Sequence, residues 1–591
     1  MKSFTFLTKT LVLLIFANTI GFAQSPANNK AFDKFLAQYY LEAVMMNPLS
    51  RTSLGDNRAN DQLPNYASAA FRKKEHDYKV KYLRSLKAFN RKALNPSERI
   101  TYDMIEMDLK DSLEAEQFHD EYIPFDQYSG LPLEFPGLGS GNSIQPFKTV
   151  KDYRNWLKRI DGFTVYADTV IGNFNKGIAS GIVLPRALVL KMIPQLKAQI
   201  VTDTSENIFY KPILNMPASF SAKDKAKLRL EYQLAISNKI IPTYTKLAQY
   251  IENSYLPKAR LTSGINGLPN GAARYNFIVR AFTTTDKTPE EINQIGVNEV
   301  QRITGEIETL KNKIGFKGSV ADLFSYMVTA KEFFPFRSEE EILQAYRNIL
   351  PQIEPNLKKL FNLRPKSAME IMAIEKYRAG SAAANYRRGT ADGVRPGVFN
   401  VPIFEPEKYN KLGMESLFVH EGIPGHHYQI SLQMEDQALP KVRQLAVFSV
   451  FAEGWALYTE SLGEELGLYT DPYQRLAAYQ YEIWRAVRLV VDTNLHTGKM
   501  TREEAIAYMM EKTGKDDAKS TAEIERYLSN PGQALCYKIG ELKIHELKAK
   551  YQKSLGSKFD IRNFHDAILK VGSVPLFAFE KYMDDWAKSE N

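Results

Sequence analysis

Residues 412–435 read LGMESLFVHEGIPGHHYQISLQME, and three of the eight histidines of this 591-residue chain lie in them. Apolar residues recur at helical spacing on both sides of Pro424 and Gly425. Proline has no backbone N–H, and its ring clashes with the carbonyl four residues earlier, which here belongs to His420. We therefore expect an amphipathic helix that bulges or breaks at Pro424.

The histidines of this segment suggest a zinc site. In the common form H-E-x-x-H, two histidines one turn apart bind the ion and the glutamate is the general base. On an ideal helix His426 stands about 120° away from His420, whereas His427 shares the face of His420 about 10.5 Å further along the axis. A bulge that absorbs two residues would bring His426 beside His420. We predict these two histidines as ligands, with His427 as the alternative second ligand and Glu421 as the base.

The third ligand is expected in the downstream segment FAEGWALYTE, residues 451–460. Glu453 and Glu460 are two helical turns apart and share one face. A carboxylate on an apolar, aromatic helix face is costly unless it is paired or bound to a metal. We predict Glu453 as the third ligand, which leaves one position open for water, and Glu460 as the partner of a ligand histidine. The alternative is that both are surface acids of an ordinary helix.

Helical periodicity extends over most of the chain, and neither a low-complexity linker nor a repeat divides it. We predict a mainly α fold: one large helical body over residues 24–591, with a deep groove and with 24–290 and 291–591 as candidate lobes. The clearest predicted helices cover residues 31–46, 223–250, 290–314, 473–495, 501–513 and 534–550.

One short segment, residues 395–404, has the composition of a strand, and its prolines suit only the edge of a sheet. It precedes the histidine segment closely. An edge strand can pair with an extended peptide through its main chain. We therefore predict Phe399, Asn400 and Val401 as substrate-binding residues. A short structural hairpin is the alternative.

Residues 1–23 have the features of a secretory signal peptide: Lys2 and Lys9, then an apolar run shorter than the ~20 residues a membrane span needs, then small residues. We expect an exported protein, periplasmic or secreted, without stable membrane insertion after cleavage; a single membrane anchor is the alternative. Cleavage removes two lysines and lowers the formal net charge from +9 to +7. This dispersed excess predicts no nucleic-acid partner. The lone Cys536 excludes an internal disulfide.

The chain resembles a bacterial family known as domain of unknown function 885 along essentially the whole mature sequence. The matching motifs are HEGIPGHHYQ, AEGWALYTE and RYLSNPGQALCYKIGELKI. That family in turn is similar to helical zinc metallopeptidases of the carboxypeptidase Taq and thimet oligopeptidase type. These have H-E-x-G-H and, on a later helix, a glutamate ligand followed seven residues on by another glutamate. Glu453 and Glu460 have that spacing, whereas two inserted residues around Pro424 depart from it.

The resemblance implies hydrolysis of peptide bonds with a zinc-activated water, from which Glu421 takes the proton. It also implies that a tyrosine from a C-terminal helix stabilises the oxyanion. Tyr537 is our candidate and Tyr527 the second choice; a core aromatic is the alternative for either. His496 is a candidate for fixing a ligand or substrate, although a structural histidine is the favoured interpretation.

Arg485 and Arg488 are candidates for binding a substrate carboxylate, which would favour carboxypeptidase over oligopeptidase action; ion-paired arginines are the alternative. The sequence thus predicts an exported zinc metallopeptidase with a peptide or small protein as substrate. Two other functions stay open: an inactive peptide-binding scaffold of the same fold, and a zinc hydrolase of other amides or esters. Substrate identity and oligomeric state are open as well.

Overall fold

The computed structural model describes residues 29–374, 376–379, 383–390 and 392–590. The predicted signal peptide lies outside these residues. The fold is mainly α with one small sheet, as predicted. In the described part of the chain, no helix has the length and apolar character that crossing a membrane requires.

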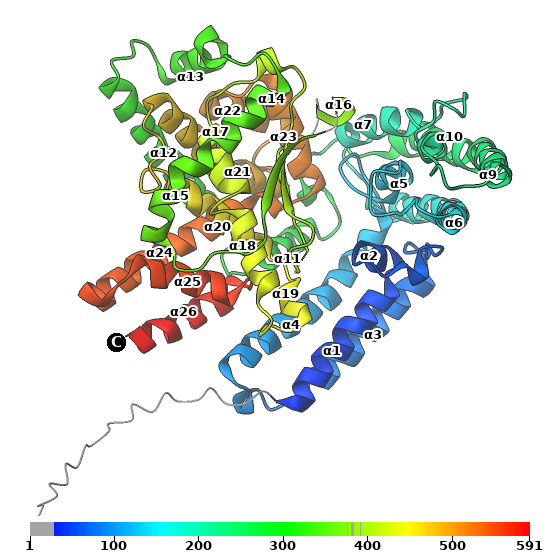
Figure 1. Cartoon of the computed structure of the whole chain (residues 1–591), viewed down its shortest axis with the longest axis horizontal. Helices are drawn as coiled ribbons and strands as arrows, with labels where there is room; N and C mark the ends of the chain where they lie inside the picture. Colours follow the sequence, from blue (N-terminus) through cyan, green and yellow to red (C-terminus); the bar gives the residue numbers. More distant parts are fainter. Residues whose placement is uncertain (1–28, 375, 380–382, 391, 591) are drawn as a thin grey trace, which may run out of the picture.

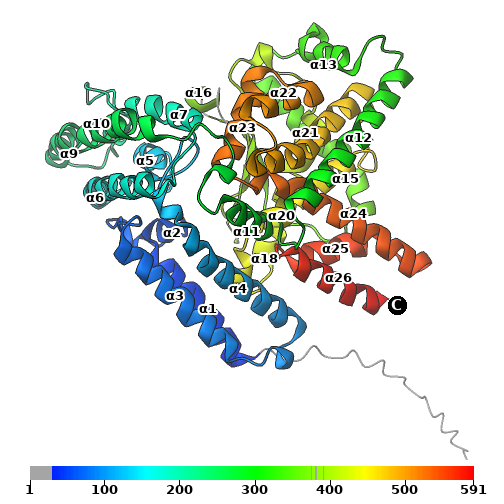
Figure 2. The same cartoon turned by 180° about the vertical axis from the view of Figure 1, so that it is seen from behind.

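The first half of the chain forms two neighbouring groups of helices, drawn blue and cyan to teal in Figures 1 and 2. The blue group packs around an aromatic cluster that includes Phe32, Phe35 and Tyr82. Its helices are α1 (Lys30–Met46), α2 (Pro48–Ser53), α3 (Ala69–Lys87) and α4 (Pro96–Glu114). The next group comprises α5 (Leu131–Gly139), α6 (Val150–Ser180), α7 (Arg186–Lys197), α8 (Lys211–Leu214), α9 (Ala222–Ala235) and α10 (Ile241–Tyr250).

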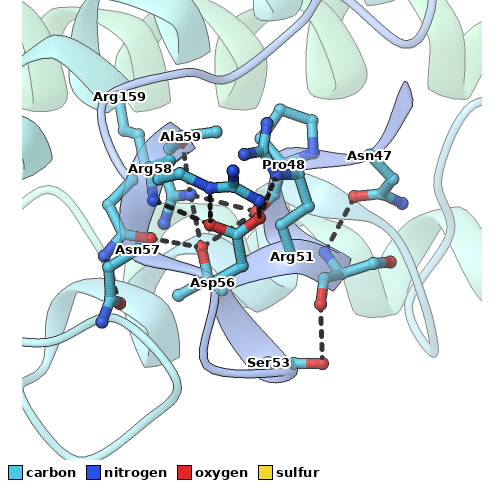
Figure 3. A network of polar contacts seen from close by, with 12 residues as sticks. Asn47, Pro48, Arg51, Ser53, Asp56, Asn57, Arg58, Ala59 and Arg159 are labelled. Carbon is cyan, nitrogen blue, oxygen red and sulfur yellow. Dashed lines mark hydrogen bonds and ion pairs between the residues drawn. The ribbon is translucent and has the colours of Figure 1, made fainter. Parts of the chain in front are cut away.

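A buried arginine joins these two groups (Figure 3). Arg159 of α6 is fully buried, and its guanidinium donates to Thr52 Oγ1 at 2.8 Å and to the carbonyl oxygen of Ala59 at 3.3 Å. Burial lowers the pKa of Arg159 to about 10, so the side chain still carries its charge near neutral pH. The charged hydrogen bonds fix the loop after α2 against α6.

The larger body, drawn green to red, contains the predicted site (Figure 1). Its helices are α11 (Gly271–Thr283), α12 (Pro289–Lys313), α13 (Val320–Thr329), α14 (Glu339–Arg347), α15 (Ile349–Leu360), α16 (Lys376–Ala379), α17 (Met414–Glu421), α18 (His426–Glu435), α19 (Lys441–Gln444), α20 (Ser449–Ser461), α21 (Pro472–Thr497), α22 (Arg502–Thr513), α23 (Asp517–Ser529), α24 (Cys536–Leu555), α25 (Ile561–Val571) and α26 (Leu576–Glu590). The groove and the division into lobes stay predictions.

The strand predicted from residues 395–404 exists, but the prediction that it is an edge strand is wrong. It is β3 (Gly397–Val401), the middle strand of three: β1 (Met369–Ala373) pairs with it in parallel and β2 (Asn385–Arg387) pairs with it antiparallel. The prolines that suggested an edge, Pro396 and Pro402, flank the strand and remove no hydrogen bond from its interior.

This central place contradicts the substrate-binding role predicted for the strand. Phe399 and Asn400 are paired on both sides, so their backbone groups are not available to a peptide. Phe399 and Val401 are also fully buried in the core of the larger body. The unpaired backbone edges of the sheet belong to β1 and β2.

Helices α20 and α24 lie in direct backbone contact, which fixes the part of the site that each one carries. A Cβ built on Gly454 would meet the Cα of Gly540 at 2.5 Å, and one on Gly540 would meet the carbonyl oxygen of Val450 at 1.9 Å. Only glycine fits at both positions. Glu453 and Tyr537 therefore extend from two helices whose separation is set by backbone contact.

Candidate metal centre

The chain breaks between α17 and α18 instead of bulging within one helix. Helix α17 ends at Glu421, helix α18 begins at His426, and the indole of Trp455 on α20 donates to the carbonyl oxygen of Pro424 between them at 2.9 Å. A Cβ on Gly425 would lie 2.0 Å from the carbonyl oxygen of His420. Glycine at this position therefore lets the start of α18 approach the end of α17.

The break brings three predicted ligands together. The imidazole Nε2 atoms of His420 and His426 lie 3.6 and 3.4 Å from Oε2 of Glu453. One ligand atom from each of the three side chains falls within 4.8 Å of the other two. His420 is nearly buried, whereas the side chains of His426 and Glu453 are 13% and 21% exposed, so the cluster opens to solvent on their side.

A buried network orients His420. Its Nδ1 lies 2.7 Å from Oε1 of Glu460, and this oxygen also accepts from the guanidinium of Arg485 at 3.4 Å. The other carboxylate oxygen, Oε2, accepts from the hydroxyl of Ser416 at 2.5 Å. With Nδ1–H donated to the carboxylate, loss of the second ring proton frees a lone pair on Nε2, the atom that faces Glu453. Ser416 was not predicted as a site residue, although it precedes His420 by one helical turn.

The centre favours a positive charge. Burial works against the protonated imidazole of His420, but its hydrogen bonds with Glu453 and Glu460 outweigh burial and raise its pKa to about 9. For Glu453, burial opposes the carboxylate, yet hydrogen bonds with His420 and His426 hold its pKa well below the usual range. The carboxylate is thus ionised, and a cation among these three side chains would be stabilised.

His427 does not take part in the cluster. It is buried, and its Nδ1 lies 3.1 Å from the hydroxyl of Tyr386 on β2. It lines a separate cavity of about 720 Å³ together with Met369, Ile423 and Tyr428. Of the two adjacent histidines, the structure brings His426 to Glu453 and turns His427 away.

The predicted base adjoins the cluster in the chain, and the first choice of oxyanion donor lies within electrostatic range of Glu453. Glu421 directly follows His420 and, within the described residues, makes no hydrogen bond or ion pair through its carboxylate, so it is available to a water. Burial raises the pKa of Tyr537 to about 12, and the charge of Glu453 adds to the effect. Tyr527 is less suitable, because its hydroxyl donates to Glu523 and accepts from Arg488.

Two other candidate residues, His496 and Arg488, are each held by contacts of their own. His496 is buried away from the cluster: its Nδ1 accepts from the backbone N–H of Ile265 and its Nε2 donates to the carbonyl oxygen of Tyr527, each at 3.1 Å. These bonds indicate a structural histidine. Arg488 is 4% exposed and stacks on the ring of Tyr537, with its guanidinium carbon 4.2 Å from the ring centroid.

The three side chains suit a zinc ion. Two imidazoles and one carboxylate are a common ligand set of catalytic zinc sites. Bonds of about 2.0–2.1 Å in a tetrahedron place ligand atoms about 3.3 Å apart, close to the observed 3.4 and 3.6 Å. The Glu460 carboxylate behind His420 supplies the hydrogen bond that metal-binding histidines need on their other nitrogen.

Comparison with known proteins identifies the family. The model of the bacterial proteins of unknown function DUF885 matches residues 48–583. The chain belongs to the DUF885 family. No curated protein matches it significantly.

Two solved structures have the same fold. One is described as a "putative lipoprotein" from Colwellia psychrerythraea: it is 26% identical, with a TM-score of 0.87, over 95% of this chain and 99% of that one. The other, described as a "putative lipoprotein of unknown function" from Shewanella oneidensis, is 20% identical, with a TM-score of 0.72, over 93% of this chain and 99% of that one. The second likeness concerns the fold alone.

Proposed function

We propose that this DUF885 protein is a zinc-dependent peptidase. The observation that carries the proposal is the convergence of His420, His426 and Glu453 beside Glu421, a base with no other partner in the described chain. The ligand set leaves room for a water, and the carboxylate needed to deprotonate it directly follows a ligand. This combination is typical of zinc hydrolases.

Each residue has a separate role in this proposal. His420, His426 and Glu453 would hold the ion, which when bound lowers the pKa of a water to about 7 and polarises a carbonyl. Glu421 accepts the proton of the attacking water and passes it to the leaving amine as the peptide C–N bond breaks. Tyr537 donates a hydrogen bond to the carbonyl oxygen as it gains negative charge.

We further propose that the protein is exported. The support is the signal-peptide composition of residues 1–23, together with the related structure from Colwellia psychrerythraea, which is described as a putative lipoprotein. This chain has no cysteine near the proposed cleavage site, since Cys536 is its single cysteine. The location we propose is the periplasm or the extracellular medium.

Cleavage of a mixed peptide library by the zinc-loaded protein tests the activity. The wild type should hydrolyse peptides, and Glu421→Gln should keep its zinc while losing about 10²–10⁴-fold in kcat/KM, the usual contribution of a general base. Tyr537→Phe should lower kcat with little change in KM. A zinc-loaded wild type that cleaves no peptide over a broad pH range would disprove the proposal.

A further inference from the structure

A stripe of three buried polar side chains on α21 holds the segment that leads to Tyr537. Arg488, Asp492 and His496 follow one another at intervals of one helical turn, so they share one face of the helix. Nε of Arg488 donates to the hydroxyl of Tyr527 at 3.0 Å, and Nε2 of His496 donates to the carbonyl oxygen of Tyr527 at 3.1 Å. Two members of the stripe therefore hold the end of α23, which precedes Tyr537 in the chain.

The third member, Asp492, binds the turn from which the helix of Tyr537 begins. Its two carboxylate oxygens accept the backbone N–H of Gly532 at 3.1 and 3.2 Å. One of them, Oδ1, also accepts from the hydroxyl of Tyr275 on α11 at 2.6 Å. A 3₁₀ turn, Gln533–Leu535, follows Gly532 and continues into α24 without a break. The position of Gly532 therefore sets the first turn of α24, and Tyr537 with it.

The same segment is also confined by α11 and α20. Gly532 has a φ of +75°, and a Cβ there would lie 2.7 Å from Cγ2 of Ile278 on α11, so only glycine fits. Further along α24, Gly540 is in backbone contact with Gly454, which directly follows Glu453. The chain between these two glycines, which includes Tyr537, is thus fixed at one end by α21 and α11 and at the other end beside a predicted metal ligand.

Asp492 is a costly side chain for such a contact. It is fully buried, and it makes no ion pair with any residue in the described part of the chain. Burial raises its pKa to about 7, against the hydrogen bonds from Tyr275 and Gly532, which favour the carboxylate. A buried carboxylate without an ion pair is costly, and carboxylates with perturbed pKa values cluster at functional sites. The cost indicates that the contact serves the site as well as the fold.

We propose that Asp492 is a positioning residue for Tyr537: through Gly532 it keeps the Tyr537 hydroxyl where it can donate to the carbonyl oxygen of a scissile peptide bond. Arg488 supports the same ring from the side, with its guanidinium carbon 4.2 Å from the ring centroid. This inference rests on the proposed peptidase function and gives a role in it to a side chain that does not touch the substrate.

A double-mutant cycle with the zinc-loaded full chain tests the inference. Asp492→Asn keeps the shape of the side chain but turns an NH₂ group toward the N–H of Gly532 or the hydroxyl of Tyr275. We expect kcat for peptide cleavage to fall roughly 10–100-fold, as for a misplaced catalytic group, with little change in KM. In a Tyr537→Phe background the same substitution should lower kcat no further, because Asp492 acts through that hydroxyl. Equal losses of kcat in both backgrounds would overturn the inference.

The matched control is Asp566→Asn on α25. Asp566 is also a buried carboxylate that accepts backbone N–H groups, those of residues 362 and 363, each at 3.2 Å. It does not hold the segment that carries Tyr537. Asp566→Asn should therefore lower the melting temperature, as Asp492→Asn does, and keep the kcat of the wild type.

Hydrogen exchange followed by mass spectrometry gives a readout that does not depend on activity. In Asp492→Asn the backbone amides of residues 530–537 should exchange roughly tenfold or more faster than in the wild type, whereas in Asp566→Asn they should exchange at the wild-type rate. Unchanged exchange of this segment in Asp492→Asn would overturn the inference. Faster exchange together with a wild type that cleaves no peptide would support the anchoring and contradict the peptidase proposal. Wild-type kcat in Tyr537→Phe would overturn the inference and leave the peptidase.

Tyr275→Phe is the second variant, for the case that a substitution of the fully buried Asp492 prevents folding. It removes one donor hydroxyl from the same carboxylate and leaves the N–H of Gly532 in place. It should lower kcat severalfold, again with no further loss in the Tyr537→Phe background, and speed exchange of residues 530–537. Wild-type kcat together with wild-type exchange in Tyr275→Phe would contradict the inference.

Discussion

Gly425 is the residue on which the geometry of the candidate metal centre depends. The hydrogen that it carries in place of a side chain lets the backbone at His426 lie against the last turn of α17, where any Cβ would overlap the carbonyl oxygens of Val419 and His420. The sequence indicates a zinc motif with a proline inside it. The close backbone approach at Gly425 explains how that motif still brings His420 and His426 beside the carboxylate of Glu453.

Gly425→Ala should therefore weaken metal binding. The added methyl group must push α18 away from α17, which moves His426 from Glu453, and overpacking of this kind costs about 1–3 kcal/mol. We expect at least a tenfold loss of zinc affinity in a chelator competition and a lower melting temperature. Gly305→Ala on α12 is the control, because a Cβ there meets no atom within 4 Å. Equal zinc affinity in both variants would contradict this role of Gly425.

Glu460 is expected to act on zinc through His420. Glu460→Gln keeps the size of the side chain but removes the negative charge that faces Nδ1 of His420 and the guanidinium of Arg485. Loss of such a partner typically costs about 10–100-fold in metal affinity, which competition with a chelator measures. Glu464→Gln, on an exposed side chain that pairs with Arg475, should leave the affinity unchanged. The explanation fails if Glu460→Gln binds zinc as tightly as this control.

Among the elements, the helices could be predicted well and the sheet poorly. The helix predicted over residues 290–314 begins at Pro289 as α12, with a capping box formed by Thr288 and Glu291, and the helix predicted over residues 473–495 appears as α21, Pro472–Thr497. Local signals of this kind decide where a helix begins. Strand order depends on distant partners, and β1, MEIMA, contains a single β-branched residue. The central place of β3 was therefore not predictable from residues 395–404.

Helices α15 and α20 are linked by a buried histidine whose titration affects stability. Nδ1 of His565 donates to the carbonyl oxygen of Leu360 at 2.9 Å, and its Nε2 accepts from the hydroxyl of Tyr458 at 2.8 Å. Burial lowers its pKa to about 3. Below about pH 6.5 the unfolded chain takes up a proton at this position and the folded chain does not, so the free energy of unfolding falls as the pH falls.

Urea unfolding from neutral to mildly acidic pH checks this prediction. His565 should contribute a decrease of up to about 1.4 kcal/mol per pH unit below pH 6.5, and nothing above it. His565→Gln should reduce the slope of the free energy of unfolding against pH. The variant should also be less stable than the wild type at neutral pH. His119→Gln is the control, because that side chain is half exposed. Parallel pH profiles for wild type and His565→Gln would refute the assignment.

For the whole molecule, sequence reasoning could select three side chains that the fold brings together, but not how the chain positions them. Helical spacing and the two motifs were sufficient to select His420, His426 and Glu453. The choice between His426 and His427 depends on backbone directions at the break, which no periodicity describes. Arg488 on α21 faces Glu523 on α23, and its buried, unpartnered Nη1 is visible only in the folded chain.

The central claim is that His420, His426 and Glu453 form a zinc site that excludes His427. The most direct test is the zinc content per chain of the purified wild type and of His426→Ala and His427→Ala. We predict one zinc in the wild type, retention of that zinc in His427→Ala, and its loss in His426→Ala. A wild type that binds no zinc, or a variant pair in which His427→Ala loses the ion and His426→Ala keeps it, would contradict the claim.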